Sequence, residues 1–340
     1  MILKISATKT VHSMQPFSIP EPQYRLGLEI AGISISLGSF LPWEEEPAFV
    51  PFVNESASPD FQVVFHRTDM LPEIPAAVIH EDECYRVHPD GRKGYLRSFF
   101  DAPRDYTPYA VAEYDHESGR VWIECLPKGN RCVSQLHNSF FHIGFEAMLI
   151  SRQRLCFHAA CVDTAFGGIL FSGPSGIGKS TQANLWCAYR RAKQINGDRP
   201  ILSKEGAGWR AWGSPYAGSS GCHVNDSCRI GAIVVLQQGR ECTIHRLNPS
   251  EAFRAVWPGL TVHSWDKGFV EKAFDLTENL IRNVPVYRLT CTPDENAVVC
   301  LEEELGKEFT YGRNEDWKTG ADGIPVYQGQ PAEDSAERNL

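Results

Sequence analysis

The chain has 340 residues, of which 42% are hydrophobic and 22% charged, with a formal net charge of -9 and a pI near 5.7. This composition is typical of a globular protein, and the length suits one large domain or two ordinary ones. The acidic balance argues against nucleic acid or an anionic membrane as a partner, because both attract clustered Lys and Arg. No stretch approaches ~18 consecutive apolar residues, and the eleven cysteines lack paired metal-binding spacing. We therefore expect a cytoplasmic protein with reduced thiols and no membrane partner.

Residues 1–132 are predicted to form a β-rich N-terminal domain. Short runs with alternating or β-branched apolar residues occur at 25–31, 61–65, 109–114 and 120–125, and Pro, Asp and Gly separate them. No residue pattern in this part indicates a chemistry.

Residues 133–306 are predicted to form a second domain that begins with one apolar helix over 133–151. Its apolar residues cover more than one face, so we expect it to lie between two layers. Strands are expected at 155–163, 168–171, 232–236 and 286–289, with helices at 269–282 and after 294. The fold class is therefore α/β, or α+β overall, with a mixed sheet in the second domain. Residues 307–340 are polar and are expected to form a mobile tail.

The residues from 173 to 180 match the phosphate-binding pattern G-x-x-x-x-G-K-[ST] at every fixed position. By chance, about one chain in a hundred of this length would match. An apolar strand is expected directly before the loop and a helix directly after it, which is the context that such a loop requires. We expect a site for ATP with Mg²⁺, formed by Gly173, Pro174, Ser175, Gly176, Ile177, Gly178, Lys179, Ser180 and Thr181.

Each part of this P-loop has a physical role. Glycines let backbone N–H groups point at a phosphate, and the following helix directs its positive end to the same anion. Lys179 would supply a charge for the β- and γ-phosphates, and the Ser180 hydroxyl would bind Mg²⁺.

Two further residues are candidates for the chemistry. Asp198 follows the P-loop helix and a short expected strand, where a carboxylate could hold Mg²⁺, accept a proton from a hydroxyl, or both. The alternative is an ordinary Asn-Gly-Asp turn. His158 lies on the expected strand before the P-loop strand, where it is either a catalytic group or a buried core histidine. The Gly- and Ser-rich segment 212–221 is expected to be a loop that either contacts a ligand or only connects strands.

These residues together resemble the catalytic domain of the HPr serine kinase/phosphorylase family, whose fold is related to phosphoenolpyruvate carboxykinase. The resemblance covers roughly 155–305 and rests on His158, the loop from Gly173 to Ser180, and Asp198. The segments 213–218, 229–236 and 286–294 are similar to smaller proteins of this type found beside peptide-modification genes. The HPr enzymes have two adjacent aspartates where this chain has Asn196-Gly197-Asp198. The resemblance implies that this pair serves both transfer and the reverse reaction, so the reverse reaction stays open here.

The resulting hypothesis is an ATP- and Mg²⁺-dependent kinase that phosphorylates a serine-type hydroxyl, with a peptide or small protein as partner. Lys179, Asp198 and His158 are its expected catalytic residues, and Ser180 and Asp198 its expected metal ligands. Two alternatives stay open: an ATP-binding accessory or sensor protein without transfer, and a kinase of a small metabolite. A homo-oligomer is also left open.

Overall fold

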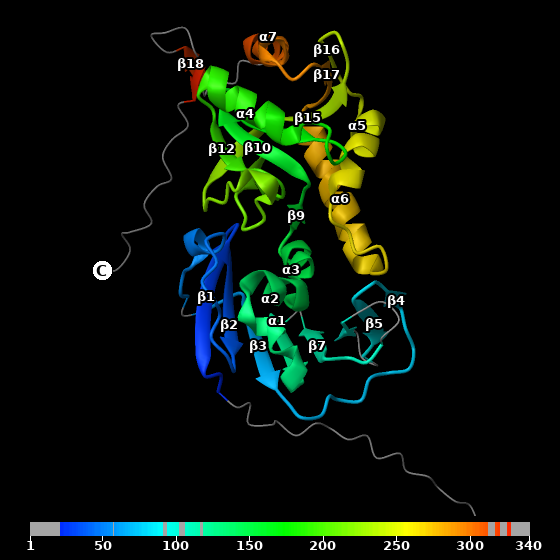
Figure 1. Cartoon of the computed structure of the whole chain (residues 1–340). Coiled ribbons are helices and arrows are strands. Elements are labelled where there is room, and N and C mark those ends of the chain that lie inside the picture. Colours follow the sequence, from blue (N-terminus) through cyan, green and yellow to red (C-terminus); the bar gives the residue numbers. More distant parts are fainter. Residues whose placement is uncertain are drawn as a thin grey trace, which may run out of the picture.

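The computed structural model describes residues 21–56, 58–90, 94–101, 106–115, 118–311, 317–319 and 325–327. The fold is mixed α/β with two large mixed sheets, which confirms the expected class. Figure 1 shows the sheets in two stacked units, with the P-loop unit above the N-terminal unit. Most of the tail expected at 307–340 lies outside the described residues.

The first sheet has eight strands in the order β1-β2-β3-β8-β7-β6-β5-β4. Its β2–β3 and β3–β8 pairs are parallel and its other pairs antiparallel. A short 3₁₀ helix, η1 (Val50–Phe52), follows β2. The strands are β1 (Tyr24–Ile30), β2 (Ile33–Ser39), β3 (Phe61–Arg67), β4 (His80–Glu81), β5 (Tyr85–Pro89), β6 (Tyr95–Phe99), β7 (Ala110–Asp115) and β8 (Arg120–Cys125).

The apolar segment after β8 forms three short helices instead of the single helix expected over 133–151. These are α1 (Arg131–Ser134), α2 (Leu136–Ile143) and α3 (Phe145–Ser151). Gly144 separates α2 from α3 with a φ of +66°, and a Cβ there would lie 3.0 Å from the Tyr114 ring. The chain can turn here because glycine adopts a positive φ without strain, and the Tyr114 ring leaves little room for a side chain.

These helices share the buried core of the first sheet. Phe140, Phe145 and Met148 pack with sheet residues such as Phe65 and Ile123. Ala147 and Ile150 of α3, however, lie in a buried core of the second sheet. The segment 133–151 therefore packs against both units, as expected of a segment between two layers. The sequence pattern correctly indicated burial, but it could not indicate which sheet the helices would cover.

The second sheet has nine strands, seven of them in the order β12-β10-β11-β15-β14-β13-β9. In addition, β17 pairs with β15 and β16. The pairs β11–β15 and β15–β17 are parallel. The strands are β9 (Arg154–Cys156), β10 (Ala159–Thr164), β11 (Gly167–Ser172), β12 (Lys193–Asn196), β13 (Ile201–Glu205), β14 (Gly208–Trp212), β15 (Ser227–Gln238), β16 (Thr243–Arg246) and β17 (Val286–Cys291). A separate hairpin joins β18 (Trp317–Thr319) to β19 (Pro325–Tyr327).

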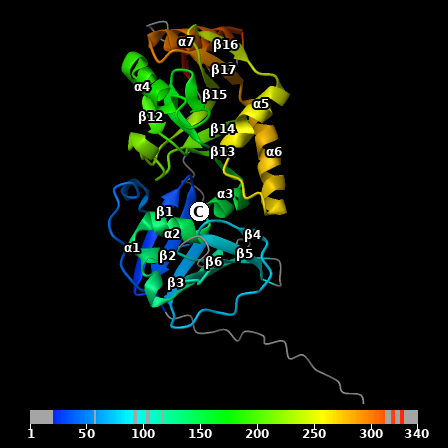
Figure 2. The same cartoon turned by 45° about the vertical axis from the view of Figure 1, so that its right-hand side comes forward.

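Helices cover both faces of the second sheet. On one face α4 (Lys179–Arg190) and α7 (Glu295–Tyr311) bury a core that includes Trp186 and Leu301. On the other face α5 (Pro249–Val256) and α6 (Lys267–Asn283) bury a second core that includes Phe269. Figure 2 shows α6 extending down the side of this unit toward the N-terminal unit. Within the described part of the chain, no helix is both long and apolar enough to cross a membrane.

The two units meet at a buried arginine. Arg97 on β6 is only 4% exposed, and its Nη2 lies 3.4 Å from His263 Nδ1, on the segment before α6. Four aromatic rings have their centroids 5.2–5.7 Å from its guanidinium carbon: those of Tyr85, Tyr95, Tyr114 and Trp265. Three rings come from the first sheet and one from the P-loop unit, so this cation–π cage joins the units.

Candidate functional site

Three segments meet at one edge of the second sheet. The P-loop follows the carboxyl end of β11, and Asp198 follows the carboxyl end of β12. Strand β10 lies between them and is antiparallel to both, so His158, directly before its first residue, reaches the same edge. The topology thereby brings together the P-loop, Asp198 and His158, although up to 40 positions separate them in the sequence.

The P-loop has an open backbone cradle. Gly173, Gly176 and Gly178 have φ values of +141°, +76° and +114°, which favour glycine. A Cβ at Gly176 or Gly178 would meet no described atom within 4 Å, so both glycines face open space. The amides of residues 178–181 make no hydrogen bond within the described protein, as expected of a helix start that offers its N–H groups to an anion.

Lys179 folds back over the loop that precedes it. Its Nζ donates to the carbonyl oxygens of Gly173 and Pro174, each at 3.1 Å, and the residue is 8% exposed. Burial lowers the pKa of Lys179, and the charge of Asp198 acts in the opposite direction. The ammonium is thus held at the mouth of the cradle, where phosphate oxygens could replace the two carbonyls as acceptors.

Asp198 is the centre of a charged cluster. Its Oδ1 lies 3.3 Å from His158 Nε2, and its Oδ2 lies 3.6 Å from Arg199 Nε. All three side chains are 30–39% exposed, so they are reachable from solvent. The Asp198 carboxylate therefore lies where it can exchange a proton with His158 and still face a ligand on the P-loop.

His158 lies in a break between two strands, whereas we expected one strand over 155–163. Strand pairing stops because the Phe157 amide donates to the Pro200 carbonyl and the His158 amide to the Gly259 carbonyl. Burial lowers the pKa of His158, Lys179 lowers it further, and Asp198 opposes both effects. The ring is therefore favoured in its neutral form, as a proton acceptor requires.

This lowered pKa predicts a pH dependence of stability. The unfolded state takes up a proton near the ordinary pKa of 6.5, whereas the folded state does so only at lower pH. The contribution of neutral His158 to the free energy of unfolding is therefore fully present above pH 6.5. It is lost as the pH falls from 6.5 toward the pKa of His158 in the folded state. We expect His158→Gln to show a smaller decrease in melting temperature between pH 7 and pH 5 than the wild type. His245→Gln, at an exposed position, is the control. Parallel curves for His158→Gln and the wild type would contradict this expectation.

Asn196 is a site residue that the sequence interpretation missed. It is fully buried, and its Oδ1 accepts from the amides of Asp198 and Arg199 at 3.0 and 2.7 Å. Its Nδ2 donates to the Ser214 carbonyl at 3.1 Å. The expected Asn-Gly-Asp turn is present, and because Asn196 forms it and thereby orients Asp198, the turn does not exclude a functional role for the carboxylate.

Replacement of Asn196 by alanine should destabilise the protein. The change removes the acceptor of two backbone amides and one donor, so we expect a loss of about 2–4 kcal/mol in the free energy of unfolding. Denaturant unfolding measures it. Asn283→Ala removes an exposed asparagine that bonds only within its own helix and should cost far less. Equal losses for both variants would mean that the Asn196 turn is not structurally important.

The middle residue of this turn explains why a second acid is absent. A Cβ at Gly197 would lie 1.7 Å from Ser220 Oγ and 2.9 Å from the Ala217 carbonyl oxygen. No aspartate fits there unless the loop after β14 moves. That loop, expected over 212–221, packs directly on the acid, since a Cβ at Gly218 would lie 2.8 Å from Asp198 Cβ.

A second segment missed in the sequence lies beside His158. This segment contains Gly259 and Thr261. The Thr261 Oγ1 accepts a hydrogen bond from Arg199 Nη1 at 3.0 Å, and the Thr261 amide donates to the Cys156 carbonyl. No local pattern indicates these contacts. Arg229 lies near the start of β15, beside the start of β11, and therefore not at this edge. Among the described residues, no three His, Cys, Asp or Glu side chains gather as a metal centre. The Ser180 hydroxyl and the Asp198 carboxylate are oxygen donors of the kind that Mg²⁺ prefers.

Comparison with known proteins gives little further information. No protein-family model and no curated protein matches the chain. Among solved structures, the chain is similar to the HPr(Ser) kinase/phosphatase from Coxiella burnetii at 13% sequence identity. The match covers 46% of this chain and 93% of that one, with a TM-score of 0.30. A similarity of this size does not identify a family.

Proposed function

We propose that this protein is an ATP- and Mg²⁺-dependent kinase that phosphorylates a serine-type hydroxyl on a peptide or small protein. The observation behind the proposal is the meeting of an open P-loop with the Asp198–His158 pair at one sheet edge. A P-loop alone supports nucleotide binding. A carboxylate and a neutral imidazole beside its lysine add a proton acceptor for an attacking hydroxyl.

The residues would divide the work as follows. The amides of the loop from Gly173 to Thr181 would hold the phosphates, and Lys179 would stabilise the charge of the transferred group. Ser180 and Asp198 would hold Mg²⁺, which neutralises phosphate charge when bound. The hydroxyl oxygen would form the new bond to the γ-phosphorus while the bond to ADP breaks. The hydroxyl proton would pass to Asp198 or His158.

The loop over 213–221 supports an acceptor site on the outer side of Asp198. It packs against the acid at Gly218 and is anchored through Ser214, whose Oγ donates to the Arg199 carbonyl at 2.7 Å. A loop held against the catalytic acid is well placed to contact the acceptor. We propose that it forms one wall of the acceptor site.

One observation favours the accessory-protein alternative. Gly197 leaves no room for a second carboxylate, so Asp198 is the only acid in its turn. If a pair of acids were required for transfer, this chain would bind ATP and transfer nothing.

Incubation with γ-labelled ATP, Mg²⁺ and a cellular peptide extract separates the possibilities. Label in a peptide supports the proposal, and label in a small metabolite supports a metabolite kinase. Binding of ATP with no label in either fraction would favour the accessory protein. No binding of ATP at all would reject every nucleotide-based function for this chain.

A further inference from the structure

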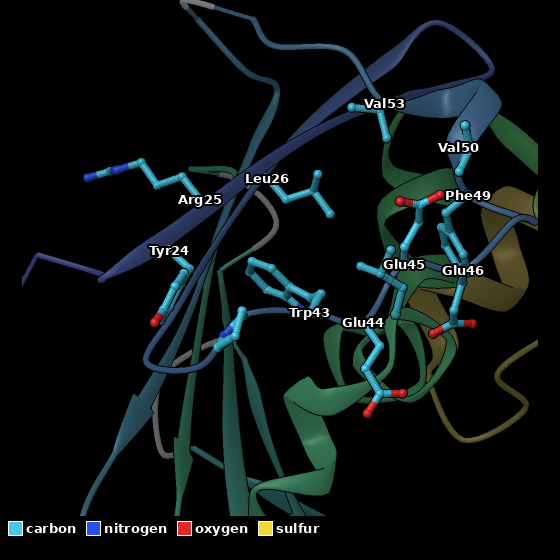
Figure 3. Close-up of a pocket in the computed structure, with 12 residues that line it drawn as sticks. Tyr24, Arg25, Leu26, Trp43, Glu44, Glu45, Glu46, Phe49, Val50 and Val53 are labelled. Carbon is cyan, nitrogen blue, oxygen red and sulfur yellow. The ribbon is translucent and has the colours of Figure 1, made fainter.

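A pocket of about 310 Å³ lies in the N-terminal unit, away from the P-loop. Its lining comes from the first residues of β1, the segment 42–46 after β2, and the region of η1 (Figure 3). This volume is at the lower end of the range for ligand sites. Since β1 is the first strand in the sheet order, the pocket opens at a sheet edge.

The pocket has a preformed apolar floor. The Trp43 indole is held by its Nε1, which donates to Ser139 Oγ at 3.0 Å. Phe49 is 2% exposed, and its ring centroid lies 4.9 Å from that of Phe140. Around this floor, Tyr24 is 41% and Val53 52% exposed. Fixed aromatic rings with exposed apolar neighbours are typical of a protein-binding surface.

Three consecutive carboxylates flank the apolar floor. Figure 3 shows Glu44, Glu45 and Glu46 on one side of the pocket, with Tyr24 and Arg25 on the other. Glu46 Oε2 lies 2.9 Å from His137 Nδ1, which holds it in place. Glu45 is exposed, and no described residue hydrogen-bonds to its carboxylate or pairs with it. With three acids and one arginine, the pocket is complementary to a ligand that carries positive charge.

The backbone of β1 favours an extended ligand. The outer side of β1 is partly covered where the Asn54 amide donates to the Gly27 carbonyl at 3.0 Å and Leu28 pairs with Val53. In the part of β1 that precedes Gly27, no described residue forms a backbone hydrogen bond with the outer side of the strand. An added strand could therefore pair with this short stretch and place its side chains in the pocket.

We propose that this pocket docks an extended peptide segment in which a basic side chain lies beside an apolar one. The apolar side chain would rest on Trp43 and Phe49, and the basic one would face Glu44 and Glu45. No P-loop residue lines the pocket, and β1 contacts the second sheet near its other end, where Arg154 Nε of β9 donates to the Ala31 carbonyl. From Ala31 back to Tyr24 the strand covers roughly 20 Å. Only its role as a docking site for the kinase substrate rests on the proposed function; the binding itself does not.

The test uses a short fluorescein-labelled peptide in which lysine stands two positions from leucine or tryptophan, so that both side chains face the same side of an extended strand. Anisotropy is measured with the full chain and without nucleotide, beside a matched peptide with glutamate in place of lysine. We expect the lysine peptide to bind at least about tenfold more tightly. Glu45→Lys should weaken this binding about tenfold, and Trp43→Ala should weaken it further. Glu73→Lys makes the same charge change at an exposed position outside the pocket and should leave binding unchanged.

Several outcomes would overturn the proposal. Equal loss with Glu45→Lys and Glu73→Lys would mean that the peptide responds only to net charge. Absence of peptide binding by a folded wild-type chain would reject the site. A wild-type dimer that Trp43→Ala dissociates would also reject it, because the pocket would then bind a second copy of the chain. Lys179→Ala must bind the peptide as the wild type does. If the peptide binds and no phosphate is transferred, the proposed function fails and the docking site stands.

Discussion

Lys179→Ala is expected to lower ATP affinity by about 100-fold or more and to abolish phosphate transfer. The loss corresponds to two charge-assisted hydrogen bonds to phosphate, worth about 3 kcal/mol or more in total. Binding of a fluorescent ATP analogue with Mg²⁺ measures the affinity. The folded protein should not be weakened to the same degree, because within the described part of the chain the ammonium hydrogen-bonds to the two loop carbonyls alone.

Lys193→Ala is the matched control for this variant. Lys193 begins β12, close to the site in sequence, but its Nζ forms an exposed ion pair with Asp226. Its removal should leave nucleotide affinity within a factor of two or so, since exposed ion pairs contribute about 1 kcal/mol or less. If the two lysine variants bound ATP equally well, the cradle would not be a nucleotide site.

Asp198→Asn is expected to reduce phosphate transfer by about 10³-fold and to change ATP affinity far less. An amide keeps the size of the side chain, but it can neither accept a proton nor supply a carboxylate to a metal ion. The variant also removes the charge that His158 and Arg199 face at 3.3 and 3.6 Å. Single-turnover transfer from γ-labelled ATP measures the rate, and the ATP-analogue titration measures the affinity.

Asp226→Asn is its control, because Asp226 is a carboxylate of the same unit that pairs with Lys193 away from the P-loop edge. It should transfer phosphate at the wild-type rate. A normal transfer rate in Asp198→Asn would remove Asp198 from the mechanism. If neither the wild type nor the variant transferred phosphate to any acceptor, the accessory-protein reading would replace the kinase.

Much of the second unit could be predicted from the sequence because its signals are local. The P-loop pattern, the apolar strand before it and the helix after it are contiguous, and the structure has β11 and α4 at these places. The buried run at 232–236 and the periodic helix at 269–282 lie within β15 and α6 for the same reason. The expected fold class follows from these elements.

The predicted elements are wrong where contacts with residues distant in sequence determine the backbone conformation. The strand expected over 155–163 is interrupted because Phe157 and His158 bond to Pro200 and Gly259, which no nearby residue indicates. Likewise, the helix expected over 133–151 breaks between α1 and α2 and again at Gly144, whose positive φ lies beside the Tyr114 ring of β7. Apolar periodicity reports burial but not the partner surface.

Within the site, the sequence indicated which residues to consider but not how they are held. Asp198 and His158 were named from their positions relative to the P-loop, and the structure places them 3.3 Å apart. The role of Asn196 was hidden because an Asn-Gly-Asp turn looks the same whether or not its aspartate is functional. The contact of Arg199 with Thr261 depends on the fold alone.

The cation–π cage at Arg97 has a consequence for dividing the chain into parts. The segment that places Trp265 and His263 at Arg97 begins with Gly259 and Thr261, which bond to His158 and Arg199. A truncation after α3 would therefore expose the Trp265 indole in the P-loop unit and weaken the anchoring of the segment that contacts His158 and Arg199. In the N-terminal unit, the Arg97 guanidinium would lose its contact with the Trp265 ring. The two sheets are thus parts of one functional body, and neither is a module that can be removed without changing the other.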